Sequence, residues 1–197
     1  MALQATSSSS VMNRMMRAAR LEVPLYEEVE GDRTATNQAL LVVVLVAVAS
    51  GLGAGIGASL AGASGGGLVG RLVSGLLSAL IGWAVWSYVV YFVGTRFFGG
   101  TATYGELLRT LGFAESPSVL LILSFIPVLG GLLSLVVLIW TIVTSFIATR
   151  QALDIDNTKT VLTILIGAVA LIVVITVISL IFATVFAAGS LFGAAAR

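Results

Sequence analysis

The 197-residue sequence contains no histidine and no cysteine, and only 10% of its residues are charged. These absences exclude a thiolate nucleophile, a Ser–His pair, a disulfide framework and the usual zinc sites. The chain also lacks the glycine-rich, lysine-containing loop of ordinary ATP motors. A net charge of +1 gives no bulk attraction for nucleic acid. We therefore expect a protein that is not an enzyme and that holds no cofactor and no metal.

Apolar side chains, in contrast to charged ones, are abundant in this sequence. Hydrophobic residues make up 58% of the chain, and the mean hydropathy is +1.11. A soluble domain carries about 25% charged residues, far more than this chain. Long apolar runs with almost no charge are typical of transmembrane helices. The sequence therefore predicts an all-α integral membrane protein whose first partner is the lipid bilayer.

The apolar runs predict a polytopic bundle of five transmembrane helices. The expected spans cover residues 39–60, 72–93, 118–129, 132–149 and 161–186. The third is short because Pro127, Gly130 and Gly131 break an apolar stretch that would otherwise be about 50 Å long as one helix. The chain then divides into a partly disordered N-terminal segment at 1–37, a membrane domain at 38–187 and a short tail at 188–197.

A more polar helix is expected near residues 103–113, before the third span. Leu107 and Leu111 alternate there with Glu106 and Arg109. The stretch is too short and too polar to span, so we expect it to lie at the membrane interface. Glu106 and Arg109 are three residues apart and are expected to pair.

The N-terminal segment carries most of the remaining charge. Residues 11–21 combine methionines and arginines, which fits either a short helix on the membrane surface or a solvated tail. Pro24 is expected to end any helix there. The acidic cluster that follows comprises Glu27, Glu28, Glu30 and Asp32. It is either a surface for a partner's basic patch or a solvated linker.

Small residues in the first span indicate close helix packing. Gly51 and Gly55 are four residues apart, and so are Gly53 and Gly57. This spacing lets two helices approach closely in lipid, within one chain or between two copies.

A stripe of hydroxyl groups follows one face of the fourth span. It comprises Ser134, Thr141, Ser145 and Thr149. Such a stripe either lines a polar path or bonds to a neighbouring helix. We expect every acidic residue, Glu115 included, to lie in a loop or at an interface.

The distribution of basic residues predicts the topology. With five crossings and a cytoplasmic N-terminus, eight of them face the cytoplasm: Arg14, Arg17, Arg20, Arg33, Arg96, Arg109, Arg150 and Lys159. Only Arg71 and Arg197 lie outside. A single crossing at residues 117–149 would move Arg150 and Lys159 outside, so the positive-inside rule favours five crossings, with the N-terminus in the cytoplasm and the C-terminus outside.

Several loose motifs recur along residues 21–185. A basic residue precedes two glycines at residues 96–100, and Thr103–Leu107 begins a helix in the pattern [ST]-[FY]-x-[ED]-[LI]. Gly112–Ala114 precedes Pro117, and a Pro-x-x-Gly break and the Arg-Gln-Ala of Arg150–Ala152 follow. With the P-x-Y-E-E-V stretch before the first span, the chain resembles the Yip family of Ypt/Rab-interacting membrane proteins, in its prokaryotic branch.

The resemblance implies a five-span fold with a cytoplasmic N-terminus, in a prokaryotic cytoplasmic membrane. Eukaryotic members act without catalysis, bind prenylated Rab-type GTPases and assist membrane organisation. Their Asp-Leu-Tyr-Gly-Pro-type motif is absent from this sequence.

Three functions remain open from the sequence. The first is a non-enzymatic membrane-organising scaffold that binds a membrane protein or itself. Its partner surface is expected at Glu27, Glu28, Glu30, Arg96, Glu106 and Arg109. The second is a small channel or carrier built on the broken third and fourth spans. The third is an accessory subunit of a larger complex.

Overall fold

The computed structural model describes residues 10–62 and 67–195, with the backbone alone at residues 68 and 185–195. Over these ranges the chain is helical and forms no strand. The helices are α1 (Val11–Ala19), α2 (Val23–Gly31), α3 (Ala35–Leu60), α4 (Leu68–Phe98), α5 (Tyr104–Ala114), the 3-10 helix η1 (Ser116–Phe125), α6 (Leu129–Leu153) and α7 (Asn157–Ala195). The predicted all-α fold is confirmed.

Five segments are long and apolar enough to cross a membrane, as predicted. They are Ala35–Leu60, Val69–Phe98, Tyr104–Phe125, Leu129–Leu153 and Asn157–Thr184. Each has at least 22 residues, which reaches about 33 Å as an α-helix and matches the hydrocarbon core of a bilayer. The backbone of α7 continues as a helix to Ala195, beyond the end predicted for the last span.

The third crossing is built differently from the expected short span. The helix predicted near residues 103–113 forms as α5, and only Glu115 separates it from η1. A 3-10 helix rises about 2.0 Å per residue, so α5 and η1 together extend about 36 Å. Buried Leu107, Leu111 and Phe113 place α5 inside the bundle. The polar first half of this crossing is therefore covered by other helices.

The predicted helix break lies at Pro127 and Val128. Val128 has a φ of 65°, a backbone region that a branched side chain rarely adopts. Gly130 and Gly131 both fall in the first turn of α6. A Cβ atom on Gly130 would collide with the backbone of Ser124, whereas one on Gly131 would meet open space. Gly130 is thus the glycine that lets α6 fold back against η1.

Close backbone approach joins α3 to the third crossing. A Cβ atom on Gly53 would overlap the carbonyl oxygen of Leu121 and lie 2.6 Å from the Oγ atom of Ser124. One turn later, a Cβ atom on Gly57 would lie 3.4 Å from the Cα atom of Phe125. Glycine is required at position 53 because no side chain fits there.

The other two glycines of this stretch have different surroundings. A Cβ atom on Gly51 would lie 2.9 Å from the Cδ2 atom of Leu72, so this residue faces α4. Gly55 is buried within α3. The small-residue stretch therefore contacts two neighbours within one chain.

Helices α1 and α2 pack on one end of the bundle and form what we call the cap, residues 11–31. Five apolar side chains of the cap are at most 5% exposed: Met15, Ala18, Leu25, Tyr26 and Val29. The segment after Pro24 was expected as a linker or surface cluster, but it is a helix. Pro24 occupies its first turn, where a missing N–H group costs nothing. The disorder expected for the first ten residues falls almost wholly outside the described ranges.

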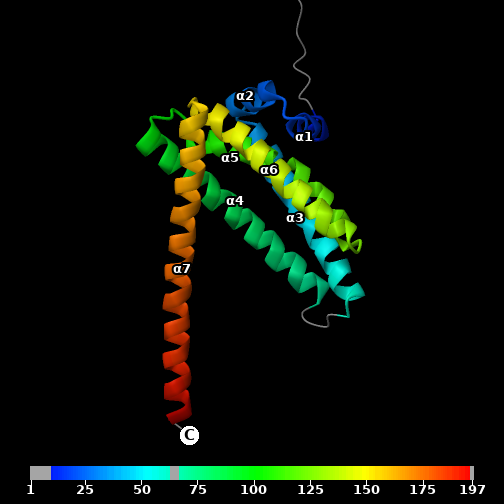
Figure 1. Cartoon of the computed structure of the whole chain (residues 1–197), viewed down its shortest axis with the longest axis vertical. Coiled ribbons are helices and arrows are strands. Elements are labelled where there is room, and N and C mark those ends of the chain that lie inside the picture. The colour runs from blue at the N-terminus through cyan, green and yellow to red at the C-terminus, as the bar shows by residue number, and fades with distance from the viewer. Residues whose placement is uncertain (1–9, 63–66, 196–197) are drawn as a thin grey trace, which may run out of the picture.

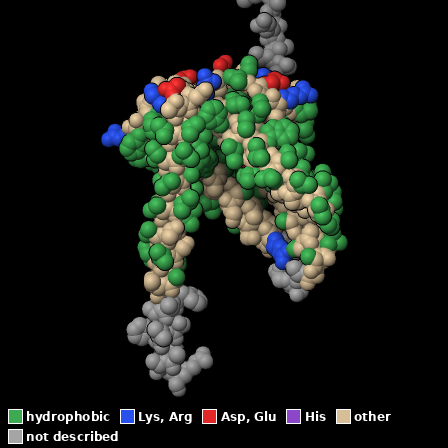
Figure 2. Space-filling model, viewed as in Figure 1, with side chains coloured by type: hydrophobic (Ala, Val, Ile, Leu, Met, Phe, Trp, Pro, Cys, Tyr) green, Lys and Arg blue, Asp and Glu red, His purple; other side chains and the backbone are tan. Residues whose placement is uncertain are grey.

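Helices α3 and α6 both pack on η1 and are inclined in the view of Figure 1, where α4 runs below them and passes α7 near its upper end, and α7 descends to one side. The lower part of α7 stands apart from the other helices, and its apolar side chains are exposed, as at Ile172 and Phe182. Charged side chains gather around the cap and the turns beside it, while apolar side chains cover the shafts (Figure 2). This division matches a bundle in lipid with one strongly charged end.

Candidate functional site

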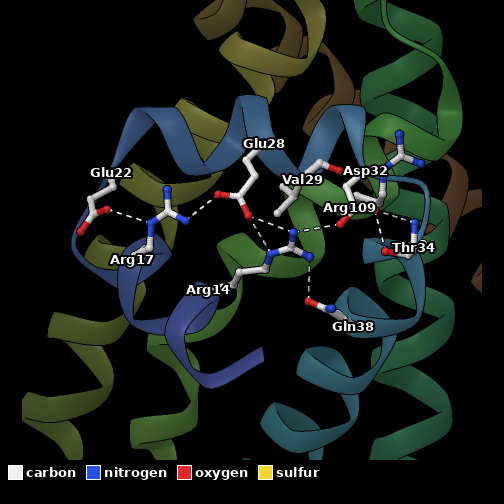
Figure 3. Close-up of polar contacts among 9 residues, drawn as sticks. All are labelled: Arg14, Arg17, Glu22, Glu28, Val29, Asp32, Thr34, Gln38 and Arg109. Carbon is white, nitrogen blue, oxygen red and sulfur yellow. Dashed lines mark hydrogen bonds and ion pairs between the residues drawn. The ribbon is translucent and has the colours of Figure 1, made fainter. Parts of the chain in front are cut away.

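The charged end is organised around Arg14, whose side chain is only 5% exposed. Its Nε atom donates to the Glu28 carboxylate at 3.0 Å, and its Nη2 atom donates to Asp32 at 2.8 Å (Figure 3). Its Nη1 atom donates to the Gln38 side chain at 2.8 Å. One guanidinium group therefore ties α1 to α2, to the turn after it and to α3.

A second arginine of α1 extends the network. The Nη1 atom of Arg17 donates to Glu28 at 2.6 Å, and its Nε atom donates to Glu22 at 3.0 Å (Figure 3). A hydrogen bond from Thr34, followed by one from Arg14, holds the pKa of the Asp32 carboxyl below its usual range. Asp32 therefore stays ionised at neutral pH and keeps its bond to Arg14.

Arg109 donates hydrogen bonds to the backbone of the cap, although the sequence suggested that it pairs with Glu106. Its Nε atom donates to the carbonyl oxygen of Val29 at 2.8 Å, and its Nη2 atom donates to that of Glu30. The expected pair with Glu106 does not form, because Glu106 accepts from the backbone N–H of Thr103 at 2.8 Å in a capping box. Arg109 thus anchors the end of α2 to the third crossing.

Glu30 lies partly buried where α2 meets the bundle. Burial raises its pKa to about 7, and the negative charges of Asp154, Glu106 and Glu27 add to the effect, while Arg109 opposes it. The carboxyl is therefore about half protonated near neutral pH. The carboxylates of Glu27, Glu106 and Asp154 therefore all raise the pKa of Glu30 at the place where α2 meets the bundle.

The other predicted partner-binding residues lie on the outside of the same end. Glu27 is exposed and accepts from the Nε2 atom of Gln151 at 3.0 Å. Arg96 is exposed at the end of α4. The structure therefore places all six predicted residues at the charged end. Glu28, Glu106 and Arg109 make structural contacts there, and Glu27 and Arg96 face outward.

Sequence reasoning missed how the cap is held. It placed Arg14 on a surface helix facing the cytoplasm rather than at the centre of a network, and it gave no role to Gln38 or to Trp140, whose Nε1 atom donates to the carbonyl oxygen of Ala19 at 2.7 Å. A tryptophan in the middle of an apolar run gives no local signal for such a bond. The spacing of Arg14 in an amphipathic helix was the one usable hint.

Glu115 requires a correction. It was expected in a loop or at an interface, but it lies inside the third crossing, Tyr104–Phe125. The eleven residues of α5 place Glu115 about 16 Å along the helix from Tyr104, where this segment begins, and a bilayer core is about 30 Å thick. Helix α5 continues without a break to Ala114, and η1 begins at Ser116, so Glu115 lies between two helices of the same crossing.

The hydroxyl stripe of α6 divides into separate roles. Thr141 lies 3.0 Å from the Ser118 hydroxyl of η1, and Ser134 donates to a carbonyl of its own helix. Ser145 lines a cavity together with Glu115. Thr149 is buried and has no hydrogen-bond partner. Among the described residues no group of three acidic side chains is arranged to hold a metal ion.

The family comparison agrees with this architecture. The family model described as Yip1 domain matches residues 24–180, which is more than half of the chain. Comparisons with curated proteins and with solved structures give no significant match. The match begins within the cap and ends within α7, so it covers the first four crossings and most of the fifth. This multi-pass membrane protein belongs to the Yip1-domain family.

Proposed function

We propose that this protein is a non-enzymatic membrane scaffold that binds a partner protein through its charged end. The observation that carries the proposal is the cap, which fixes a charged surface on top of an apolar bundle. Exposed groups of both signs lie on that surface, among them Glu27, Arg33, Arg96 and Arg150. A held surface suits recognition because its side chains lose less entropy on binding than those of a flexible tail.

We place this end in the cytoplasm of a prokaryotic cell membrane, with the C-terminus on the other side. The support is the excess of basic residues at the charged end and the odd number of crossings. Tags at both termini should become accessible from opposite sides of sealed vesicles. Accessibility from one side would contradict this orientation.

The partner surface is best tested with residues that do not hold the cap. Glu28 and Arg109 are unsuitable because their reversal would release the N-terminal helices. The double variant Arg33→Glu with Arg96→Glu reverses two exposed charges and leaves both the network of Arg14 and the Glu27–Gln151 bond intact. Arg71→Glu, near the opposite end of the bundle, is the control.

The experiment is crosslinking in native membranes, followed by mild extraction and identification of what co-purifies. We expect a protein that is retained by the wild-type chain and by Arg71→Glu and is lost at least fivefold from the double variant. A partner in fixed stoichiometry would make the chain an accessory subunit that uses the same surface. Equal recovery with all three proteins would contradict the proposed surface.

A second candidate function is a small channel or carrier. It is favoured by Glu115, because an ionisable residue inside a membrane-spanning segment commonly marks a path for an ion or solute. Ser145 and Thr141 lie on the facing side of α6. Solute flux into liposomes that falls with changes at these three positions would support this function, and absent flux for ions and small neutral solutes would contradict it.

A further inference from the structure

A cavity of about 210 Å³ lies between α3, α4, α5 and α6. Side chains of α3, α4 and α5 form apolar walls, among them Val43, Trp83, Trp86 and Leu111. Two polar side chains also line it, the Glu115 carboxyl and the Ser145 hydroxyl. The cavity is thus lined mainly by apolar side chains, with one acidic side chain among them.

Glu115 forms no ion pair with any Lys or Arg in the part of the chain that the structure describes. Its one side-chain hydrogen bond comes from the Ser118 hydroxyl at a long 3.4 Å. An ionised carboxylate at this depth is costly unless a positive charge lies beside it. The site therefore favours a cationic ligand.

The walls select the kind of cation. An inorganic divalent ion needs six or more oxygen ligands, and among the described residues only Glu115 and Ser145 supply side-chain oxygen to this cavity. Indole rings attract ammonium groups that carry alkyl substituents, most strongly where water is excluded. Trp83 already donates its N–H group to the carbonyl oxygen of Leu108 at 3.1 Å, so what it can offer a ligand is its ring.

We propose that this cavity binds a small organic ammonium cation. The positive nitrogen lies against the Glu115 carboxylate, and its alkyl or aryl substituents lie against Trp83, Trp86 and the apolar wall. This site is separate from the charged end and does not depend on partner binding there. The proposal concerns binding alone and does not require that the bound cation be carried across the membrane.

The test uses the full chain in phosphatidylglycerol nanodiscs and benzyltrimethylammonium as the probe, measured by equilibrium dialysis against empty nanodiscs. Neopentylbenzene, the neutral carbon isostere, is the ligand control. We expect saturable binding of the cation alone. No saturable binding, or equal binding of the neutral isostere, would overturn the proposal.

Two pairs of variants separate the site from the fold. Glu115→Gln removes the charge and should weaken binding at least tenfold, while Asp156→Asn, in the exposed turn before α7, should change it less than twofold. Gly82→Val adds a side chain where a Cβ atom meets nothing within 4 Å, in the cavity wall. Gly75→Val fills similar open space on α4 outside this cavity.

We expect Gly82→Val to weaken binding at least fivefold and Gly75→Val to leave it unchanged. Wild-type affinity in Glu115→Gln or in Gly82→Val would overturn the proposal. Replacing half of the lipid with phosphatidylethanolamine distinguishes a free cation from a lipid amine. An unchanged dissociation constant supports the free cation, and competition by the lipid would overturn that assignment.

Discussion

The cap and the contact between α3 and η1 hold this protein together by different means. At the contact, Gly53 lets two backbones meet, and no side chain lies between them. At the cap, Arg14, Arg17 and Arg109 donate to carboxylates and backbone carbonyls across three helices. The difference follows the solvent. In lipid, apolar surface gains little by leaving its surroundings, so shape decides which helices pack. Near water, directional polar bonds select the arrangement.

The largest expected effect is at the α3–η1 contact. Gly53→Ala places a methyl group against the Leu121 carbonyl and should lower the free energy of unfolding by about 3 kcal/mol. Gly75→Ala is the matched control, because a Cβ atom there meets nothing within 4 Å. Unfolding in mixed detergent measures both. Equal stability of the two variants would show that this contact is looser than described.

A smaller effect is expected from the centre of the cap. Arg14→Met leaves the carboxylates of Glu28 and Asp32 without their shared partner. Because both acids are partly exposed, we expect a loss of about 2 kcal/mol in cap docking. Arg20→Met, an exposed arginine just after α1, is the control.

Hydrogen exchange of residues 11–31 measures this docking. Exchange should become faster in Arg14→Met, while the five crossings keep their protection. Unchanged exchange in the cap would mean that its buried apolar side chains suffice to hold it.

The pH dependence of the cap should come from Glu30. Its pKa of about 7 in the folded chain lies above the ordinary value of 4.5, so the folded state binds a proton that the free segment releases. This contribution is complete below pH 4.5 and is lost as the pH rises through 7. After allowance for solvent screening, we expect docking weaker by about 1 kcal/mol at high pH.

Cap exchange measured at about pH 5.5 and about pH 8.5 tests this sign. Asp32 does not contribute in that window because its pKa lies below 3.8. Glu30→Gln should make the two protection factors equal, once each exchange rate is divided into the intrinsic rate of a free amide at that pH. A cap that docks more tightly at the higher pH would contradict the placement of Glu30.

The smallest expected effect belongs to a hydrogen bond inside the bundle. The hydroxyls of Ser118 and Thr141 lie 3.0 Å apart. A double-mutant cycle with Ser118→Ala and Thr141→Ala should give a coupling of about 0.6 kcal/mol. A coupling as large as the loss of docking free energy expected for Arg14→Met would contradict the difference drawn here between the cap and the interior of the bundle.

The sequence predicted five crossings because four of them are long apolar runs and the third has an apolar second half. It could not predict the cap, because the bonds that hold it join distant residues. Arg109 reaches Val29 across 80 positions, and Gln151 reaches Glu27 across 124. Local patterns instead suggested a pair between Glu106 and Arg109, and the folded chain uses both residues elsewhere.

Glu115 shows the same limit inside the membrane. It stands between Ala114 and the Ser116–Pro117 pair, a local pattern that favours a loop. Its position depends on α5 being covered, which the buried side chains of Leu107 and Phe113 reveal only in three dimensions. Apolar runs therefore locate crossings well and miss a crossing whose polar half is buried by other helices.

The most direct test of the account is a crosslink between the cap and α6. The natural chain has no cysteine, so Glu27→Cys with Gln151→Cys introduces the only two thiols. Their parent side chains are hydrogen-bonded at 3.0 Å. A short bis-maleimide reagent should join them within one chain in native membranes, while Glu27→Cys with Arg71→Cys should stay unlinked. Linking of neither pair would contradict a cap that is fixed on the charged end of the bundle.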